Sequence, residues 1–289
     1  MSDKKYVLVS DSTSDLPKEL YNQMDVKTMS FSFEIDGKSY PDGGMDFHEF
    51  YDKMRGGSST KTSQISPDTS EKCFEGFIKE GYDIICLSFS SGLSGSYNSA
   101  YIARDNLMEK YPDARIICID SLCASTGEGL LLYKAWEKKK EGMGIDELAR
   151  WIEENKLHLC HLFTVDDLKY LQRGGRISKA TAVAGSILGI KPILHVDDEG
   201  RLVAIGKVRG RKQSLNKLIE LMGERIAGYD NPVIGICHGD CWGDADYVAD
   251  LARQKLGQNI KVITSYTGTV IGAHSGPGTL ALFFMGEKR

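Results

Sequence analysis

Two hydroxyl groups and an amide stand in a row in the first quarter of the chain, at Thr62, Ser63 and Gln64. Hydroxyl groups donate hydrogen bonds without adding charge, so this row suits a carboxylate ligand. A helix is expected to begin at Pro67, and Ser63 or Ser66 could equally serve as its N-terminal cap. The segment by itself therefore leaves ligand binding and helix capping open.

A second segment, residues 90–96, reads Ser-Ser-Gly-Leu-Ser-Gly-Ser and connects an expected strand to an expected helix. Unpaired N–H groups and the dipole at a helix N-terminus favour an anion, which places Ser94 and Gly95 at a candidate site. The segment lacks the G-x-G-x-x-G pattern and the lysine of a P-loop, which weakens a phosphate- or nucleotide-binding reading. A glycine-rich turn without a ligand remains the simpler alternative.

A third segment, residues 272–278, places His274 among glycines and a proline, where we expect a loop. An imidazole there could donate to an anion and change its charge near neutral pH, although a single histidine is weak evidence. The polar run Asp11-Ser-Thr-Ser-Asp15 also follows a strand and could line the same cleft, but a turn with a helix cap explains it more simply.

The same residues suggest a rival, a serine hydrolase that uses Ser94 and His274 on an acyl substrate. Residues 92–96 come close to the G-x-S-x-G nucleophile elbow, but position 96 is serine. The acidic partner would have to be Asp240 or Asp244. A metal site at Cys237 and Cys241 is not favoured, because a second pair of ligands is missing.

The elements that must position these segments follow a β-loop-α rhythm in the first half of the chain, which predicts a mainly parallel sheet with helices on both faces. The expected strands cover 6–9, 83–89 and 115–119, the helices 96–110, 125–141 and 145–155, and residues 56–66 form a loop. The second half predicts a mixed sheet with helices on one side. Its strands cover 159–165, 193–196, 202–208, 233–237, 261–266 and 279–284, and its helices 181–188, 214–226 and 244–256.

We therefore predict an α/β protein of two domains with a ligand between them: a three-layer domain over residues 1–163 and a two-layer domain over residues 164–289. The boundary is a soft one, because no low-complexity linker marks it.

Composition narrows the class of protein. A net charge of −4 argues against non-specific nucleic-acid binding. The seven cysteines contain no C-x-x-C pair and are typical of reduced core residues, so we expect a cytoplasmic protein. No apolar run approaches the roughly 18 residues of a membrane span. Two basic clusters, one with Arg173 and Arg176 and one around Arg209, are either docking surfaces for an acidic partner or solvated faces.

Together these segments resemble the DegV family, the fatty-acid-binding subunits of bacterial fatty acid kinase, across essentially the whole chain. The resemblance rests on residues 11–16, 62–64, 90–96, 173–177 and 274–278. Each motif is short, and their order and spacing make the match specific. Ile65 departs from the proline expected in the family's T-S-Q-P-S motif.

The resemblance implies a fatty acid bound between the domains, with its carboxylate held at Thr62, Ser94 and His274 and at the adjoining Ser63 and Gly95. It implies no cofactor, no metal and no catalysis by this chain alone. A separate kinase subunit would phosphorylate the bound acid with ATP and magnesium, for use in phospholipid metabolism.

Arg209, and with it Arg173, would dock that kinase subunit, and transient contact with a membrane is compatible with this role. Uncharged donors would satisfy the carboxylate and still leave it nucleophilic, so no cation need lie in the loops that hold it.

Overall fold

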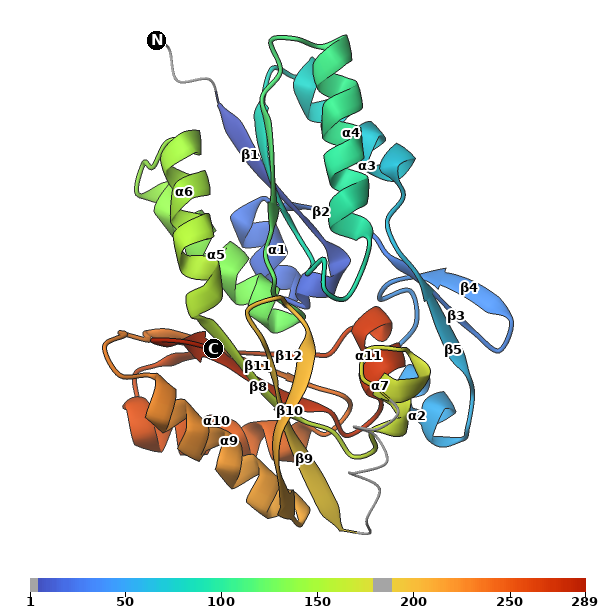
Figure 1. Ribbon diagram of the computed structural model, residues 1–289, viewed down its shortest axis with the longest axis vertical. Helices are drawn as coiled ribbons and strands as arrows, with labels where there is room; N and C mark the ends of the chain where they lie inside the picture. Colours follow the sequence, from blue (N-terminus) through green and yellow to red (C-terminus); the bar gives the residue numbers. More distant parts are fainter. Residues whose placement is uncertain (1–4, 179–188) are drawn as a thin grey trace.

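The computed structural model describes residues 5–178 and 189–289, which form three β-sheets with their helices (Figure 1). The first sheet has the order β2-β1-β6-β7, and all its pairs are parallel, as predicted. Its strands are β1 (Tyr6–Asp11), β2 (Lys27–Met29), β6 (Asp83–Ser88) and β7 (Ile116–Asp120). Every residue of β6 is buried, because helices cover both faces of the sheet.

Alternate residues of the parallel sheet pack on different helices. Val9 and Ile84 lie in the core that α3 (Pro67–Lys79) and α4 (Ser96–Lys110) complete, while Leu8 and Ile85 lie in the core on the opposite face. That second face carries α1 (Lys18–Met24), α5 (Thr126–Lys140) and α6 (Ile145–Asn155), which confirms helices on both sides.

The second sheet has six strands in the order β10-β9-β8-β13-β11-β12, and only the β11–β12 pair is parallel. The strands are β8 (Leu159–Thr164), β9 (Ile190–Val196), β10 (Leu202–Arg209), β11 (Val233–His238), β12 (Lys261–Tyr266) and β13 (Leu280–Met285). The mixed sheet is therefore confirmed. Helices α9 (Arg211–Arg225) and α10 (Trp242–Leu256) cover one face, around a core that includes Leu162 and Leu282.

Helix α5 covers the other face of the mixed sheet. Its Leu130 and Leu131 share one core with Phe163 of β8 and Phe283 of β13. A helix enclosed on nearly all sides needs apolar residues around its whole circumference, and ten of its residues are buried. The first half of the chain thus supplies a helix to the second face of this sheet, for which helices on one side only were predicted.

A small antiparallel sheet, with the order β4-β3-β5, corrects one prediction. It contains β3 (Ser32–Ile35), β4 (Lys38–Pro41) and β5 (Thr60–Ser63), and a turn at Asp36 and Gly37 joins β3 to β4. Residues 56–66 were expected to be a loop, but β5 forms there because its backbone pairs with β3, and Thr62 lies opposite Phe33. Helix α2 (Phe47–Arg55) begins after its cap Asp46.

A second correction concerns His274. Instead of a loop, the chain forms the helix α11 (Thr269–Ser275), which carries His274 in its last turn. Helix α7 (Lys169–Arg173) and two short 3-10 turns, η1 (Ser12–Ser14) and η2 (Lys156–His158), complete the described elements. The helix predicted at 181–188 lies outside the described residues.

The division at residues 163 and 164 stays a prediction, and β8, which it would cut, belongs entirely to the mixed sheet. Among residues 5–178 and 189–289, no helix combines the length and the apolar character needed to cross a membrane.

Candidate functional site

A cavity of about 730 Å³ lies where the parallel sheet, the mixed sheet and the small antiparallel sheet meet. Its volume falls within the range of roughly 300–1,000 Å³ that is usual for small-molecule sites. Most of its wall is apolar, and the apolar residues come from both halves of the chain. They are Phe31, Phe89, Leu93, Ala124, Phe163, Leu171, Val196, Leu202, Val270, Ile271, Ala281 and Phe283.

All five predicted carboxylate-binding residues line this one cavity, although they come from three separate segments. Thr62 and Ser63 lie on β5, Ser94 and Gly95 precede α4, and His274 lies on α11. Four of them are half-buried, and Ser63 is exposed. The structure thus brings together residues that are more than 200 positions apart in the chain, since Thr62 and His274 are 212 residues apart.

Thr62 and His274 contact each other directly. Thr62 Oγ1 lies 2.8 Å from His274 Nε2, and either atom can be the donor, depending on the imidazole tautomer. The other ring nitrogen, Nδ1, is buried and has no hydrogen-bond partner among the described residues. Burial, and after it the charge of Arg176, lowers the pKa of His274 to about 4, so the ring is neutral at neutral pH.

Close packing by Gly174 holds the His274 ring in place. A Cβ atom at position 174 would lie 2.1 Å from His274 Nδ1, which no side chain can occupy without moving the ring. Gly174 follows α7 directly, so the end of this helix determines where the imidazole can lie.

The loop before α4 presents hydroxyl groups at the start of that helix. Ser94 Oγ accepts a hydrogen bond from Ser96 N–H at 3.2 Å and lies 3.1 Å from Ser96 Oγ. Ser96 Oγ in turn accepts from Ile65 N–H at 3.1 Å, which ties this loop to the end of β5. A Cβ at Gly95 would lie 2.4 Å from Gln64 Oε1, so a larger residue there would displace the end of the Gln64 side chain from the helix start.

Arg176 places a cation at the cavity, outside the three segments that were predicted to hold the carboxylate. Its side chain lines the same cavity and is half-buried. The guanidinium donates to Leu93 O at 3.1 Å and to Gly174 O. Burial lowers the pKa of Arg176. Arg176 and Gln64 belong to motifs of the sequence, but neither was among the predicted carboxylate-binding residues. Their contacts with Leu93 and Gly95 are tertiary ones that no local pattern reports.

The geometry does not assemble the rival hydrolase. His274 bonds Thr62 rather than Ser94, and its Nδ1 atom meets no carboxylate in the described chain. Of the two acids considered, Asp244 pairs with Arg211 at 2.8 Å, and Asp240 pairs with Arg55 and His48. In a catalytic triad the serine bonds one nitrogen of the histidine and a carboxylate bonds the other. This arrangement is not present among these residues.

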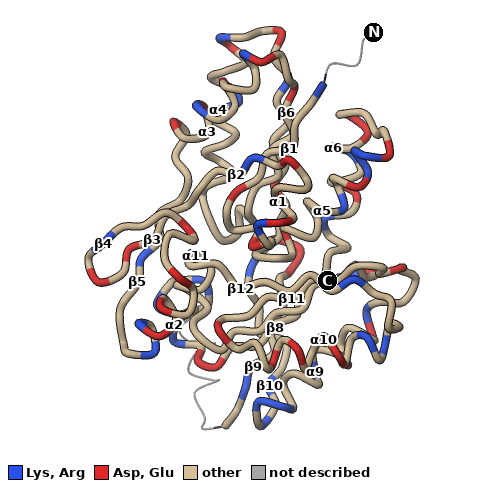
Figure 2. Tube along the Cα trace, turned by 180° about the vertical axis from the view of Figure 1, so that it is seen from behind, with Lys and Arg blue, Asp and Glu red and all other residues tan. Residues whose placement is uncertain are grey.

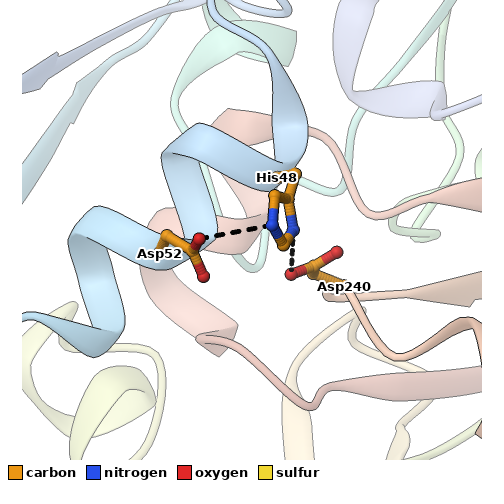
Figure 3. Close-up of side chains that lie close together, drawn as sticks. All are labelled: His48, Asp52 and Asp240. Atoms are coloured by element: carbon orange, nitrogen blue, oxygen red, sulfur yellow. Dashed lines mark hydrogen bonds and ion pairs between the residues drawn. The ribbon is translucent and has the colours of Figure 1, made fainter.

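His48, Asp52 and Asp240 form a compact group that could bind a metal ion by its geometry alone (Figure 3). His48 Nδ1 lies 3.0 Å from Asp240 and Nε2 lies 3.3 Å from Asp52, so both ring nitrogens already face carboxylates. Arg55 pairs with the same two acids at 2.8 and 2.6 Å. Together with Arg55, the three residues form an ion-pair network that connects α2 to the turn after β11.

The two expected docking arginines are both exposed. Arg173 lies at the end of α7, 4.9 Å above the Tyr170 ring, and Arg209 is the last residue of β10. Figure 2 shows Lys and Arg residues around β9 and β10. Within this cluster Arg211 pairs with Asp244, so it is engaged inside the fold.

The segment Asp11–Asp15 is structural, in line with the simpler of its two explanations. Asp11 Oδ1 caps η1 by accepting from Thr13 N–H at 3.0 Å, and Asp11 Oδ2 accepts from Phe89 N–H at 2.9 Å. Asp15 bonds Ser125, which does line the cavity. The segment therefore does not line the cavity itself but contacts a residue that does.

Comparison with known proteins identifies the family of this chain. The family model described as "Uncharacterised protein, DegV family" matches residues 5–287. A DegV domain-containing protein of Clostridium perfringens is 44% identical over 289 residues, covering 99% of both chains.

Solved structures agree with the fold. A fatty acid (stearic acid)-binding protein of Eubacterium ventriosum is 28% identical, with a TM-score of 0.88 and 98% of both chains covered. DegV of Bacillus subtilis, described as a fatty acid binding protein, is 28% identical with a TM-score of 0.84, covering 98% of this chain and 100% of its own. The chain belongs to the DegV family.

Proposed function

We propose that this protein binds one long-chain fatty acid, with the hydrocarbon tail in the apolar cavity and the carboxylate at Thr62, Ser63, Ser94, Gly95 and His274. The observation that carries the proposal is that these five residues line one mainly apolar cavity of about 730 Å³. The stearic acid named for one solved relative of the same fold, and the fatty acid binding stated for another, support this choice of ligand.

The cavity suits an acyl chain energetically. Each methylene removed from water contributes roughly 0.8 kcal/mol, so a chain of about 16 carbons gains roughly 12 kcal/mol gross. That gain is largely cancelled when the acid comes from a membrane, where the tail is already in an apolar phase. The head-group contacts then decide orientation and much of the specificity.

The bound acid is the substrate of a separate, ATP-dependent kinase subunit, which converts the carboxylate to an acyl phosphate. In this proposal the chain presents the acid and is not catalytic alone. The lack of a carboxylate behind His274 in the described chain supports a binding role over an acyl-transfer one. The exposed Arg173 and Arg209 then meet the kinase subunit.

Native mass spectrometry of the purified protein tests the ligand. A single added mass that is released on denaturation and identified as a fatty acid is the expected result. Protein that carries no lipid, and that also fails to take up a saturated or monounsaturated fatty acid after delipidation, would contradict the proposal.

The docking role needs a separate experiment. Arg209→Ala should retain fatty-acid affinity within about twofold and lose most acyl phosphate formation when a fatty acid kinase subunit and ATP are added, because a charge at an interface rim acts on association. Arg150→Ala, which changes an exposed arginine on α6, is the matched control. Loss of lipid binding in Arg209→Ala would argue against docking.

A further inference from the structure

The strands under the cavity show where the cavity ends. Side chains of β8 and β13 alternate between the two faces of the mixed sheet, and three successive pairs share the face of the cavity: Ala281 with Phe163, Phe283 with His161, and Met285 with Leu159. The first two pairs line the cavity, whereas Leu159 and Met285 are buried in the core beyond it. Because β13 leads away from α11 and His274, this boundary is the end of the cavity opposite the head-group residues.

Arg289 lies directly beyond this far end. The residue is only 7% exposed, and its guanidinium makes four hydrogen bonds. Nε donates to Leu159 O at 3.1 Å, and Nη1 donates to Asp197 O at 2.9 Å. Nη2 donates to Lys156 O at 2.8 Å and to Cys123 Sγ at 3.1 Å. Burial raises the pKa of the Cys123 thiol to about 12, so all four acceptors are uncharged.

Three of these acceptors belong to segments that continue into the cavity wall. The neighbouring wall residues are Ala124 after Cys123, Val196 before Asp197, and His161 two positions after Leu159. A guanidinium presents its N–H donors in a fixed planar arrangement. Arg289 therefore holds three separate parts of the wall together at one point.

The connection from Arg289 to His161 is the most direct. Leu159 O accepts from His161 Nδ1 at 3.0 Å as well as from Arg289, and His161 Nε2 accepts from Ala124 N–H at 3.1 Å. A Cβ atom at Gly127 would lie 2.3 Å from Nε2, so α5 packs closely against the ring. Burial, and after it the charge of Arg289, holds the pKa of His161 well below its usual range. The ring is thus neutral and fixed in place where the cavity ends.

We propose that Arg289 closes the far end of the acyl cavity and, through His161 and Ala124, sets the longest fatty acid that the protein accepts. The inference rests on the proposed function and deepens it, because it assigns the limit on tail length to named residues. A hydrogen-bonded end wall opposes a longer acid in two ways. Further methylene groups must either push the wall apart or draw the carboxylate away from its donors at the other end.

A series of saturated fatty acids of increasing even chain length tests the inference. Dissociation constants are measured for the wild-type protein, Arg289→Ala, Arg289→Lys and the control Arg150→Ala, whose arginine is exposed on α6. In the wild-type protein and the control, each added pair of methylene groups should strengthen binding by about fifteenfold until the limit is reached. Acids beyond that limit should bind no better.

In Arg289→Ala the limit should move to a longer acid, because the vacated space admits further methylene groups. The first acid beyond the wild-type limit should then gain up to about fifteenfold in affinity. Lysine fills the same space and should keep the limit of the wild-type protein. Equal changes for every acid of the series in Arg289→Ala would show that Arg289 only stabilises the fold, and would overturn the inference.

Ala124→Val tests the same end from inside the cavity and does not depend on the folding of Arg289→Ala. The added methyl groups should move the limit to a shorter acid and leave the affinity for acids below the new limit unchanged. An unchanged limit in Ala124→Val would place the closed end elsewhere and overturn the inference. A wild-type protein that binds no acid of the series contradicts the proposed function itself, which separates the two failures.

Discussion

At the residue scale, the direction of one hydrogen bond determines what the site can offer a ligand. If His274 Nε2–H donates to Thr62 Oγ1, the Thr62 hydroxyl is free to donate into the cavity. In the opposite tautomer the Thr62 hydroxyl donates to His274 Nε2 and has no hydrogen left for a ligand. The partnerless Nδ1 atom fits the first arrangement, because a buried acceptor without a donor is less costly than a buried N–H without an acceptor.

Ser94→Ala tests the serine donor. Removing the hydroxyl leaves one carboxylate oxygen short of a hydrogen bond, which costs about 1–3 kcal/mol, or roughly 5- to 150-fold in affinity. Isothermal titration with a fatty acid measures the change. Ser39→Ala, on the exposed surface of β4, should bind like the wild-type protein. Unchanged affinity and unchanged phosphorylation in Ser94→Ala would remove Ser94 from the site.

Gly174→Ala tests the packing that places His274. The added methyl group overlaps Nδ1, so the ring must move and the 2.8 Å contact with Thr62 is lost. Acid affinity should fall at least about tenfold, with a stability loss of about 1–3 kcal/mol from overpacking. Gly76→Ala in α3, where nothing lies within 4 Å of the new atom, is the control and should be neutral or slightly stabilising. A Gly174→Ala protein with wild-type affinity would show that the ring position does not matter.

At the element scale, each segment of the site is positioned by the end of a helix. The loop with Ser94 ends at the start of α4, the β5 segment continues into α3, and His274 occupies the last turn of α11. Helix ends carry unpaired backbone groups that need partners, so their conformation is tightly specified by the capping residues. Ser66 is such a cap, because its Oγ accepts from Thr69 N–H at 3.2 Å.

Ser66→Ala removes the cap of α3 without touching the cavity. The free energy of unfolding should fall by about 1 kcal/mol, measured by urea denaturation, while Ser66→Asn should stay within a few tenths because asparagine caps equally well. Fatty-acid affinity of the folded protein should be unchanged in both. Equal stability of the alanine and asparagine variants would show that the cap contributes nothing.

At the scale of the whole molecule, a group of buried carboxyl groups lies beside the cavity, at the junction of the two large sheets. Burial is the main cause that raises the pKa of Asp11 to about 6, and it raises the pKa values of Asp15 and Glu128 well above their usual range. Below its raised pKa each group is protonated in the folded protein, while the unfolded chain loses the proton near its ordinary pKa. The folded state therefore binds more protons in that window, and stability falls as pH rises through it.

Glu128→Gln separates one of these contributions. Glu128 Oε1 accepts from Ser10 Oγ at 3.0 Å and Oε2 has no partner in the described chain, so glutamine fits with its amide nitrogen at the free position. The wild-type protein should lose more stability than the variant as the pH rises above the ordinary pKa of a glutamate, as measured by urea unfolding at each pH. Identical pH profiles would mean that Glu128 titrates alike in both states.

Sequence alone determined what depends on neighbouring residues along the chain. Helix α4 has the predicted bounds, Ser96–Lys110, because its apolar spacing and preceding glycine are local. The cap at Ser66, one of the two serines considered for it, likewise followed from local backbone chemistry. The short motifs were also sufficient to predict the family and the five candidate carboxylate-binding residues.

Tertiary structure alone decided what depends on distant partners. Strand β5 exists because β3 pairs with it, and α5 is shared because two sheets enclose it. Arg176 reaches the site by bonding Leu93, 83 residues away, and Thr62 meets His274 across 212 residues. Such contacts form when separate surfaces bury apolar area together, and a pattern confined to one segment holds no record of which other segment it will face.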